Sequence, residues 1–240
     1  MNSKQPLPVL PADPLSDGIE LWIMAFDSRR HADSDFSLHG ISRPSEIDRA
    51  SRTRRCEFLA GRRCARSALA SLGCESAGIP IGPDGAPRWP QGYNGSISHS
   101  SSWAAAAASG AGHRRPGVDC ESIVGATAFM DMANLVAARD ELETAERILG
   151  DRNLALTVLF SAKESAYKSL DPGARAGCDF FSFRVLLAND DSATLQVSDI
   201  RPSLRMRTYH GLYRRLDPTT ILTLVVCKDD LQGPEGRNSP

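Results

Sequence analysis

Gly117-Val118-Asp119-Cys120-Glu121 stands near the middle of the 240-residue chain and divides it into two halves. A loop of glycine, arginine and proline precedes it, so the segment predicts a strand that opens the second half. A helical pattern and several strand patterns occur on each side of it. Because helices and strands that look antiparallel occur twice, we expect an α+β fold of two similar α/β halves that meet near residue 117.

Four regions follow from this division of the chain. Residues 1–18 are rich in proline, which removes backbone donors and fixes φ, so we expect a flexible N-terminal segment. Residues 19–116 should form an N-terminal α/β subdomain, and residues 117–230 a C-terminal one. Residues 231–240 are expected to be a flexible tail.

The first half contains one long helical pattern between strand patterns. Residues 20–26 predict a buried strand, and residues 49–72 predict a helix that ends at Gly73. Residues 104–108 are all alanine, which favours a helix by propensity, but the flanking serine and glycine favour a tightly packed strand. The apolar residues expected on one face of the helix are Phe58, Ala65, Leu69 and Leu72.

The second half begins with helical patterns and ends with strand patterns. Residues 140–149 predict a helix that stops at Gly150, and residues 152–170 predict one or two helices around Phe160-Ser161. After Pro172 the pattern changes to strands. The predicted strands are 180–187, 194–197, 206–213 and 221–227.

The composition is that of an ordinary globular protein, with 41% hydrophobic and 24% charged residues. No apolar run reaches the roughly 18–20 residues of a membrane span, and the proline-rich start does not resemble a signal peptide. The net charge of −1 argues against a general nucleic-acid binder. The six cysteines are scattered without CxxC pairs, so we expect reduced thiols in a cytoplasmic protein.

Asp119 and Glu121 are the first candidate functional residues. Positions i and i+2 of a strand point to the same face, so the two carboxylates should lie side by side and repel each other. Carboxylate oxygens are ligands that Mg²⁺ prefers, and a cation would relieve this repulsion. An isolated pair of this kind is more often a solvated strand face with Cys120 pointing inward, and that alternative stays open.

The segment Phe160-Ser161-Ala162-Lys163-Glu164-Ser165-Ala166-Tyr167-Lys168 is the second candidate. Glu164 and Lys168 are four residues apart and therefore neighbours on one helix face. Two ordinary structural explanations compete with a functional one. Ser161 and Glu164 fit a helix capping box, and Glu164 with Lys168 fits an exposed ion pair.

Ser98-His99 and an arginine-rich helix face complete the candidates. Neighbours on a strand face opposite ways, so His99 is not placed to activate Ser98 as a nucleophile. His99 is either a phosphate donor or a hydrogen-bonded core histidine. The arginines are either a phosphate clamp, for which the planar guanidinium is well suited, or a solvated helix face. They are Arg54, Arg55, Arg62 and Arg66.

Taken in chain order, these elements resemble the 4′-phosphopantetheinyl transferases of the surfactin-synthetase-activating (Sfp) type. Four segments carry the resemblance, in the order and near the spacing typical of that family, and the last two form its signature pair. The Trp89-Pro90 segment is closest in pattern to the branch that includes the enterobactin synthase component D. The four segments are 58–66, 89–100, 117–121 and 160–168.

The resemblance implies an activity, a fold and partners. Members of this family transfer the 4′-phosphopantetheine arm of coenzyme A to a serine of an apo acyl, peptidyl or aryl carrier protein, and they release adenosine 3′,5′-bisphosphate. The implied fold has two pseudo-symmetric halves with coenzyme A in the cleft between them, in a monomeric chain. The branch implies siderophore or other non-ribosomal peptide or polyketide synthesis; neither the carrier protein nor the pathway can be read from the residues.

The resemblance also implies a role for each matching residue. Asp119, Glu121 and Glu164 would hold Mg²⁺, or Mn²⁺ as a substitute, against the diphosphate of coenzyme A. By the same match, Lys168 would contact the diphosphate and protonate the leaving group. A serine hydroxyl is a poor nucleophile at neutral pH, so we choose Glu164 as the base, acting directly or through a metal-bound water. The residues implied for coenzyme A binding are Arg54, Arg62, Ser98, His99, Asp119 and Lys168.

Two departures from the family pattern accompany this assignment. Some relatives carry a lysine before the tryptophan-proline segment, whereas residues 79–84 contain no basic residue, so the full set of 3′-phosphate contacts is open. Cys120 replaces a common aliphatic residue, and we expect little effect from it. A Mg²⁺-dependent phosphodiesterase acting on a nucleotide or on coenzyme A is the alternative function, and an arginine-rich nucleic-acid module is the non-enzymatic one.

Overall fold

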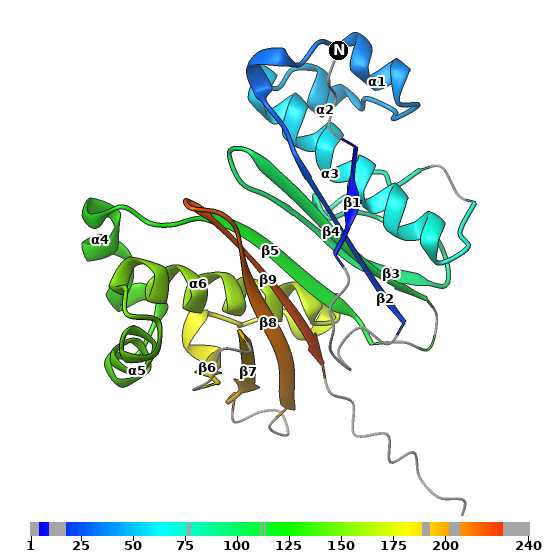
Figure 1. Ribbon diagram of the computed structural model, residues 1–240. Helices are drawn as coiled ribbons and strands as arrows, with labels where there is room; N and C mark the ends of the chain where they lie inside the picture. The colour runs from blue at the N-terminus through cyan, green and yellow to red at the C-terminus, as the bar shows by residue number, and fades with distance from the viewer. Residues whose placement is uncertain are drawn as a thin grey trace, which may run out of the picture.

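Two antiparallel sheets stacked face to face form the middle of the molecule, with one long helix on each outer side (Figure 1). The structure is a computed structural model that describes residues 5–9, 18–75, 78–110, 112, 114–188, 193–201 and 207–227. None of the helices in these ranges is long and apolar enough to span a bilayer.

The N-terminal half is a four-stranded sheet covered by α3 (Arg52–Ser71). Ser51 caps this helix by accepting a hydrogen bond from the Arg54 amide, and Gly73 adopts the left-handed conformation just after it. Two short helices, α1 (Ser34–Leu38) and α2 (Ser45–Asp48), lie before it. The strands run in the order β1-β2-β4-β3 and are β1 (Leu7–Pro8), β2 (Ile19–Ala25), β3 (Tyr93–His99) and β4 (Trp103–Gly110).

The C-terminal half is a five-stranded sheet covered by α6 (Arg152–Ser169). Asp151 caps this helix by accepting from the amides of Asn153 and Leu154. The helices α4 (Ala126–Val136) and α5 (Arg139–Leu149) pack against it. The strand order is β5-β9-β8-β7-β6, and the strands are β5 (Pro116–Ser122), β6 (Phe183–Leu187), β7 (Thr194–Asp199), β8 (Arg207–Asp217) and β9 (Thr220–Cys227).

The alanine strand β4 explains how the four layers approach closely. Ala104, Ala106 and Ala108 face α3, whereas Ala105 and Ala107 face the second sheet, and all five are fully buried. Since an alanine side chain is a single methyl group, both the helix and the second sheet can pack close to this strand. The opposite sheet contributes Val118 and Cys120 of β5 and three apolar residues of β9 to the same layer.

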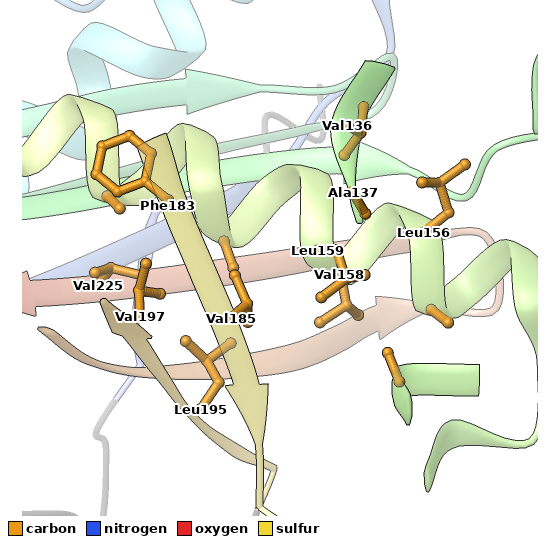
Figure 2. Close-up of a cluster of buried hydrophobic side chains, with 14 of the residues drawn as sticks. Val136, Ala137, Leu156, Val158, Leu159, Phe183, Val185, Leu195, Val197 and Val225 are labelled. Atoms are coloured by element: carbon orange, nitrogen blue, oxygen red, sulfur yellow. The ribbon is translucent and has the colours of Figure 1, made fainter. Parts of the chain in front are cut away.

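The largest core lies between α6 and the five-stranded sheet. Figure 2 shows Leu156, Val158 and Leu159 among side chains from the strands and from the end of α4. The strand residues labelled there are Phe183, Val185, Leu195, Val197 and Val225. This core fixes α6, and therefore its functional side chains, against the sheet.

A buried ion pair adds polar contacts to this core. The Lys163 ammonium lies 2.8 Å from the Glu141 carboxylate, and each side chain is only 1% exposed. Lys163 also donates to the Val136 carbonyl, and Glu141 accepts from the amides of Ala138 and Val185. These contacts join α4, α5, α6 and β6 at one point. Both buried charges have hydrogen-bond partners, which offsets the cost of removing them from water.

Most of the predicted elements are confirmed, and the corrections are local. The α+β class, the strand at residues 104–108, the helix at 140–149 and the left-handed Gly73 and Gly150 are as expected. Residues 152–169 form a single helix. The strand predicted at 180–187 begins only at Phe183, because Asp179 caps a short 3-10 turn at Phe180–Ser182.

The described part of the N-terminal segment is ordered, against expectation. Leu7–Pro8 pairs with β2, and Gln5 accepts a hydrogen bond from Arg63 of α3. Most of the predicted flexible segment 1–18, the whole of the predicted tail 231–240 and Met206 lie outside the described residues. The five cysteines whose side chains are described are free thiols.

Candidate active site

Strand β5 turns one face to α6 and the other to the N-terminal sheet. Val118 and Cys120 belong to the core between the sheets, so Cys120 points inward as expected. The alternating positions Gly117, Asp119 and Glu121 face α6. At Gly117 the two elements touch, since a Cβ atom there would lie 1.8 Å from the Ser165 carbonyl oxygen. The carboxylates of β5 therefore lie beside the helix that carries Glu164 and Lys168.

Asp119 is held by groups from both halves of the molecule. Its Oδ1 accepts from Ser98 Oγ of β3 at 2.9 Å and from Lys168 Nζ of α6 at 2.5 Å. Its Oδ2 accepts from Ser161 Oγ at 2.8 Å. The Asp119 side chain is 2% exposed, whereas 27% of the Lys168 side chain is exposed. Asp119 is thus a buried anion whose one cationic partner among the described residues remains open to solvent.

Glu121 and Glu164 complete a cluster of three carboxylates. Burial and the charges of Asp119 and Glu164 raise the pKa of Glu121 to about 7, against the opposing effect of Lys168. Burial also raises the pKa of Glu164, and Asp119 adds to this rise while Lys168 opposes it. Among the described residues, none forms a hydrogen bond with either glutamate carboxylate. The charges of Asp119 and Glu164 therefore oppose ionisation of Glu121, and the charge of Asp119 opposes ionisation of Glu164.

The donor set fits a divalent cation in its chemistry. As the side chains stand, no three acidic, histidine or cysteine groups within the described ranges converge in a metal-binding arrangement. Asp119 is instead paired with Lys168. Clustered carboxylates with raised pKa values are nevertheless the kind of site that a hard cation such as Mg²⁺ neutralises.

His99 and Arg54 form the neighbouring part of the site. Arg54 Nη1 lies 2.6 Å from His99 Nε2, and Glu57 lies 3.5 Å from Arg54 and 3.6 Å from His99 Nδ1. Burial lowers the pKa of His99, with a contribution from the charge of Arg54, so a neutral ring accepts the hydrogen bond from Arg54. His99 is thus a hydrogen-bonded, half-buried histidine at the edge of the site, next to an exposed arginine.

Arg62 lies apart from this contact, beside a cavity of about 410 Å³. Its guanidinium stacks 4.5 Å above the Phe58 ring, and its Nε has no hydrogen-bond partner within the described part of the chain. Burial and the charge of Arg54 lower the pKa of Arg62 to about 10, so it remains a cation at pH 7. Arg43, Arg66 and the apolar residues Ile79 and Ile81 also line the cavity.

Three of the competing explanations are wrong. Ser161 lies in the middle of α6 and binds Asp119, so it is not part of a capping box. Lys168 pairs with Asp119 instead of forming an exposed pair with Glu164. The arginines do not form one solvated face either, because Arg62 is buried and Arg66 donates to the His39 carbonyl.

Several residues of the site have no sequence motif that marks them. Glu57 bridges Arg54 and His99, and Thr223 of β9 contacts both Ser161 and Ser165. Arg43 lines the cavity together with residues 78–81, and residues 79–84 of the sequence contain no basic residue. The only available signal was a polar residue at position 223 in the otherwise apolar run 221–226.

Comparisons with known proteins identify the family of this chain. Residues 43–109 match the family described as the 4′-phosphopantetheinyl transferase N-terminal domain, and residues 115–221 match the 4′-phosphopantetheinyl transferase superfamily. The chain belongs to the 4′-phosphopantetheinyl transferase superfamily. The resemblance seen in the four segments is thereby confirmed, and with it the transfer of the phosphopantetheine arm from coenzyme A to a carrier protein.

Several curated relatives of this transferase are named enterobactin synthase component D. Enterobactin synthase component D of Salmonella typhi is 36% identical over 179 residues, which cover 74% of this chain and 69% of the relative. The protein of the same name from Escherichia coli K12 is 32% identical over 174 residues, covering 72% and 80%. The 4′-phosphopantetheinyl transferase Npt of Nocardia iowensis is 38% identical over 122 residues, covering 50% and 53%.

The predicted site residues divide between the two matched regions. Arg54, Arg62, Ser98 and His99 lie in the first, and Asp119, Glu121, Glu164 and Lys168 lie in the second. Ser98 with Asp119 and Lys168 joins the two regions. A site built from these residues would therefore depend on both halves being correctly packed.

Proposed function

We propose that this transferase binds the diphosphate of coenzyme A beside Asp119 in a divalent-cation-dependent reaction. The observation that carries the proposal is the convergence of Ser98 and Lys168, from opposite halves, on Asp119 Oδ1. Asp119, Glu121 and Glu164 would hold Mg²⁺ or Mn²⁺. When bound, such a cation would neutralise charge on the diphosphate and on the leaving group.

Glu164 is proposed as the general base. A serine hydroxyl is a weak nucleophile at neutral pH, so a nearby group must accept its proton as it attacks phosphorus. Burial and Asp119 raise the pKa of Glu164, which makes its carboxylate a better proton acceptor. The carrier serine oxygen then bonds to the phosphorus that bears the pantetheine arm, and its proton passes to Glu164.

Lys168 is proposed to act on the leaving group. Breaking the diphosphate bond places negative charge on the oxygen of the departing adenosine 3′,5′-bisphosphate. The Lys168 ammonium is partly exposed and already faces an anion, so it can transfer its contact from Asp119 to that oxygen and protonate it. Ser98 and the Arg54–His99 pair would position the phosphate oxygens.

The cavity beside Arg62 is proposed to take the adenosine end of coenzyme A. Its apolar walls suit a purine ring, and the unpartnered Nε of the Arg62 guanidinium suits the 3′-phosphate. Arg43 and Arg66 bring further positive charge to the same cavity, although Arg43 is also paired with Asp33 and Asp48. These residues would replace the lysine that segment 79–84 lacks.

The pathway and assembly state are part of the same proposal. The relatives named enterobactin synthase component D suggest carrier proteins of siderophore assembly, and a single chain contains every proposed site residue. We propose a monomer that acts on acyl, peptidyl or aryl carriers in the cytoplasm.

Carrier labelling tests the reaction. The protein is incubated with coenzyme A, Mg²⁺ and an apo carrier, and the intact mass of the carrier is measured. A gain equal to the phosphopantetheine arm supports transfer. Release of free phosphopantetheine without a gain on the carrier would identify the alternative phosphodiesterase.

Replacing Arg62 by alanine tests the adenosine site. We expect KM for coenzyme A to rise about 10- to 100-fold with little change in kcat, because a charge-assisted contact to phosphate is lost. The rise should be much smaller with 3′-dephospho-coenzyme A. Arg52→Ala, at an exposed position on the same helix, is the control. Equal rises with both substrates would show that Arg62 does not bind the 3′-phosphate.

The cation requirement should depend on pH through Glu121. Its pKa is raised to about 7, so the carboxylate is increasingly protonated below that pH, and a cation must displace the proton to bind. We expect the Mg²⁺ concentration for half-maximal transfer to rise as the pH falls from roughly 8 to roughly 6. Titrations of Mg²⁺ at each pH measure this. A Glu121→Gln variant should lose most of the pH dependence, and an unchanged dependence would contradict the assignment.

A further inference from the structure

Three buried hydroxyls form a chain that ends on Asp119. Thr223 lies directly opposite Asp119 in the antiparallel register of β5 and β9. Its Oγ1 is 2.8 Å from Ser161 Oγ and 2.7 Å from Ser165 Oγ. Ser161 in turn donates to Asp119 Oδ2 at 2.8 Å. The two serines are four residues apart, so they share the face of α6 that meets the sheet.

The direction of every hydrogen bond in this chain follows from counting protons. A carboxylate paired with Lys168 can only accept, so the single proton of Ser161 points to Asp119. Ser161 must then accept from Thr223, since two lone pairs would otherwise face each other at 2.8 Å. Thr223 has no second proton, so its hydroxyl accepts from Ser165, whose single proton is shared with the Thr223 carbonyl oxygen at 3.2 Å. The hydroxyls of Thr223 and Ser161 therefore point along the chain to Asp119, and Ser165 donates to Thr223.

The three hydroxyls of this chain are fully buried, so the loss of one leaves its neighbour without a partner. Ser161, Ser165 and Thr223 are each 0% exposed, so water does not replace a missing partner without a rearrangement. Hydrogen bonds in series polarise one another, which strengthens the last one in the chain. Asp119 Oδ2 therefore binds a group of the protein interior, and Oδ1 is left for Ser98 and for the partly exposed Lys168.

We propose that Thr223 and Ser165 are positioning residues that act through Ser161 to orient the Asp119 carboxylate for its ligand. This inference rests on the proposed function, because it takes Asp119 as part of the diphosphate and cation site. None of the three hydroxyls contacts substrate in this scheme. Each fixes Asp119 on β5 relative to α6, the helix that carries Glu164 and Lys168.

The test is a set of variants that remove one hydroxyl each. Thr223→Val keeps the side-chain shape, and Thr223→Ser restores the hydroxyl. Thr157→Val is the matched control: Thr157 is also a fully buried threonine, bonded to the Val124 amide and the Asn153 carbonyl, and it has no contact with Asp119. Two readouts are measured for each variant: coenzyme A binding by calorimetry at fixed Mg²⁺, and the Mg²⁺ concentration for half-maximal transfer.

We expect the effects to decrease along the chain. Ser161→Ala should weaken coenzyme A binding and raise the Mg²⁺ requirement by about tenfold, because it removes a hydrogen bond to a charged group. Thr223→Val should change both by about threefold, and Ser165→Ala by less. The transfer rate at saturating Mg²⁺ should change little. Thr223→Ser should recover the wild-type values, and Thr157→Val should lower stability without moving either readout.

Double variants separate this proposal from general destabilisation. Because Thr223 acts only through Ser161, adding Thr223→Val to Ser161→Ala should have no further effect. Adding Ser165→Ala to Thr223→Val should likewise cause no further change in coenzyme A binding or in the Mg²⁺ requirement. This second double-mutant cycle remains available if Ser161→Ala fails to fold. The proposal would be overturned if the fold-changes of the two single variants multiplied in either double variant. It would also be overturned if Thr223→Val and Thr157→Val changed coenzyme A binding and the Mg²⁺ requirement equally. A wild-type protein that labels no carrier would instead overturn the proposed function.

Discussion

Glu164→Gln is expected to fold normally, bind coenzyme A, and transfer the arm about 10²- to 10⁴-fold more slowly than the wild-type protein. Glutamine has nearly the same shape as glutamate but cannot accept the proton of the carrier serine. The Glu164 carboxylate is partly desolvated and lies near Asp119, so the neutral amide should not lower stability. Single-turnover labelling of an apo carrier, followed by intact mass, measures the rate.

Two comparisons make this result specific. Glu146→Gln, at an exposed position on α5, should transfer at the wild-type rate. Raising Mg²⁺ tests whether Glu164 acts as a base or only as a cation ligand. Recovery at high Mg²⁺ would reduce Glu164 to a ligand, and a wild-type rate in the variant would remove it from the site.

Gly117→Ala is expected to cost at least about 4 kcal/mol of folding stability and to abolish transfer. The added Cβ would lie 1.8 Å from the Ser165 carbonyl oxygen and 2.8 Å from the Ser169 amide nitrogen, both backbone atoms of α6. The helix would have to move away from β5. That movement would break the contacts of Ser161 and Lys168 with Asp119, so stability and activity should be lost together.

Urea unfolding of the variant measures the first effect, and carrier labelling the second. Gly173→Ala is the matched control, because a Cβ at that position meets no atom within 4 Å. It should unfold at the wild-type urea concentration. A Gly117→Ala protein as stable as the wild type would show that α6 does not pack against β5 as closely as described.

Local patterns account for the elements that could be predicted. The apolar repeat of α3 and its end at Gly73 are short-range features, and so is the helix before Gly150. The alanine strand was predictable only from its flanks, because propensity alone favours a helix. The structure explains the alanines: this strand is covered by α3 on one face and by the second sheet on the other, so both faces need small side chains.

The elements that were missed depend on contacts from distant parts of the chain. The strand Leu7–Pro8 exists because it pairs with β2, and α1 and α2 are too short to produce a clear periodicity. The turn at Phe180–Ser182 depends on one cap, Asp179, in a segment whose composition favours a strand. Such tertiary effects override local preference.

The sequence identified candidate site residues but not the hydrogen bonds and ion pairs between them. Asp119 and Lys168 are in contact, and the charges of Asp119 and Glu164 act on Glu121, while the roles proposed for these residues remain predictions. The pairing of Lys168 with Asp119 instead of Glu164 could not be predicted, because it depends on how α6 packs on β5. Thr223 is the clearest case, since its role depends on a strand register more than 100 residues after Asp119 in the chain.

The decisive measurement is a crystal structure with coenzyme A and Mn²⁺, in which anomalous scattering locates the cation. We predict one Mn²⁺ ion between the coenzyme A diphosphate and the carboxylates of Asp119, Glu121 and Glu164, with Lys168 on the diphosphate. A diphosphate bound away from these residues, or a cation held by other side chains, would contradict it.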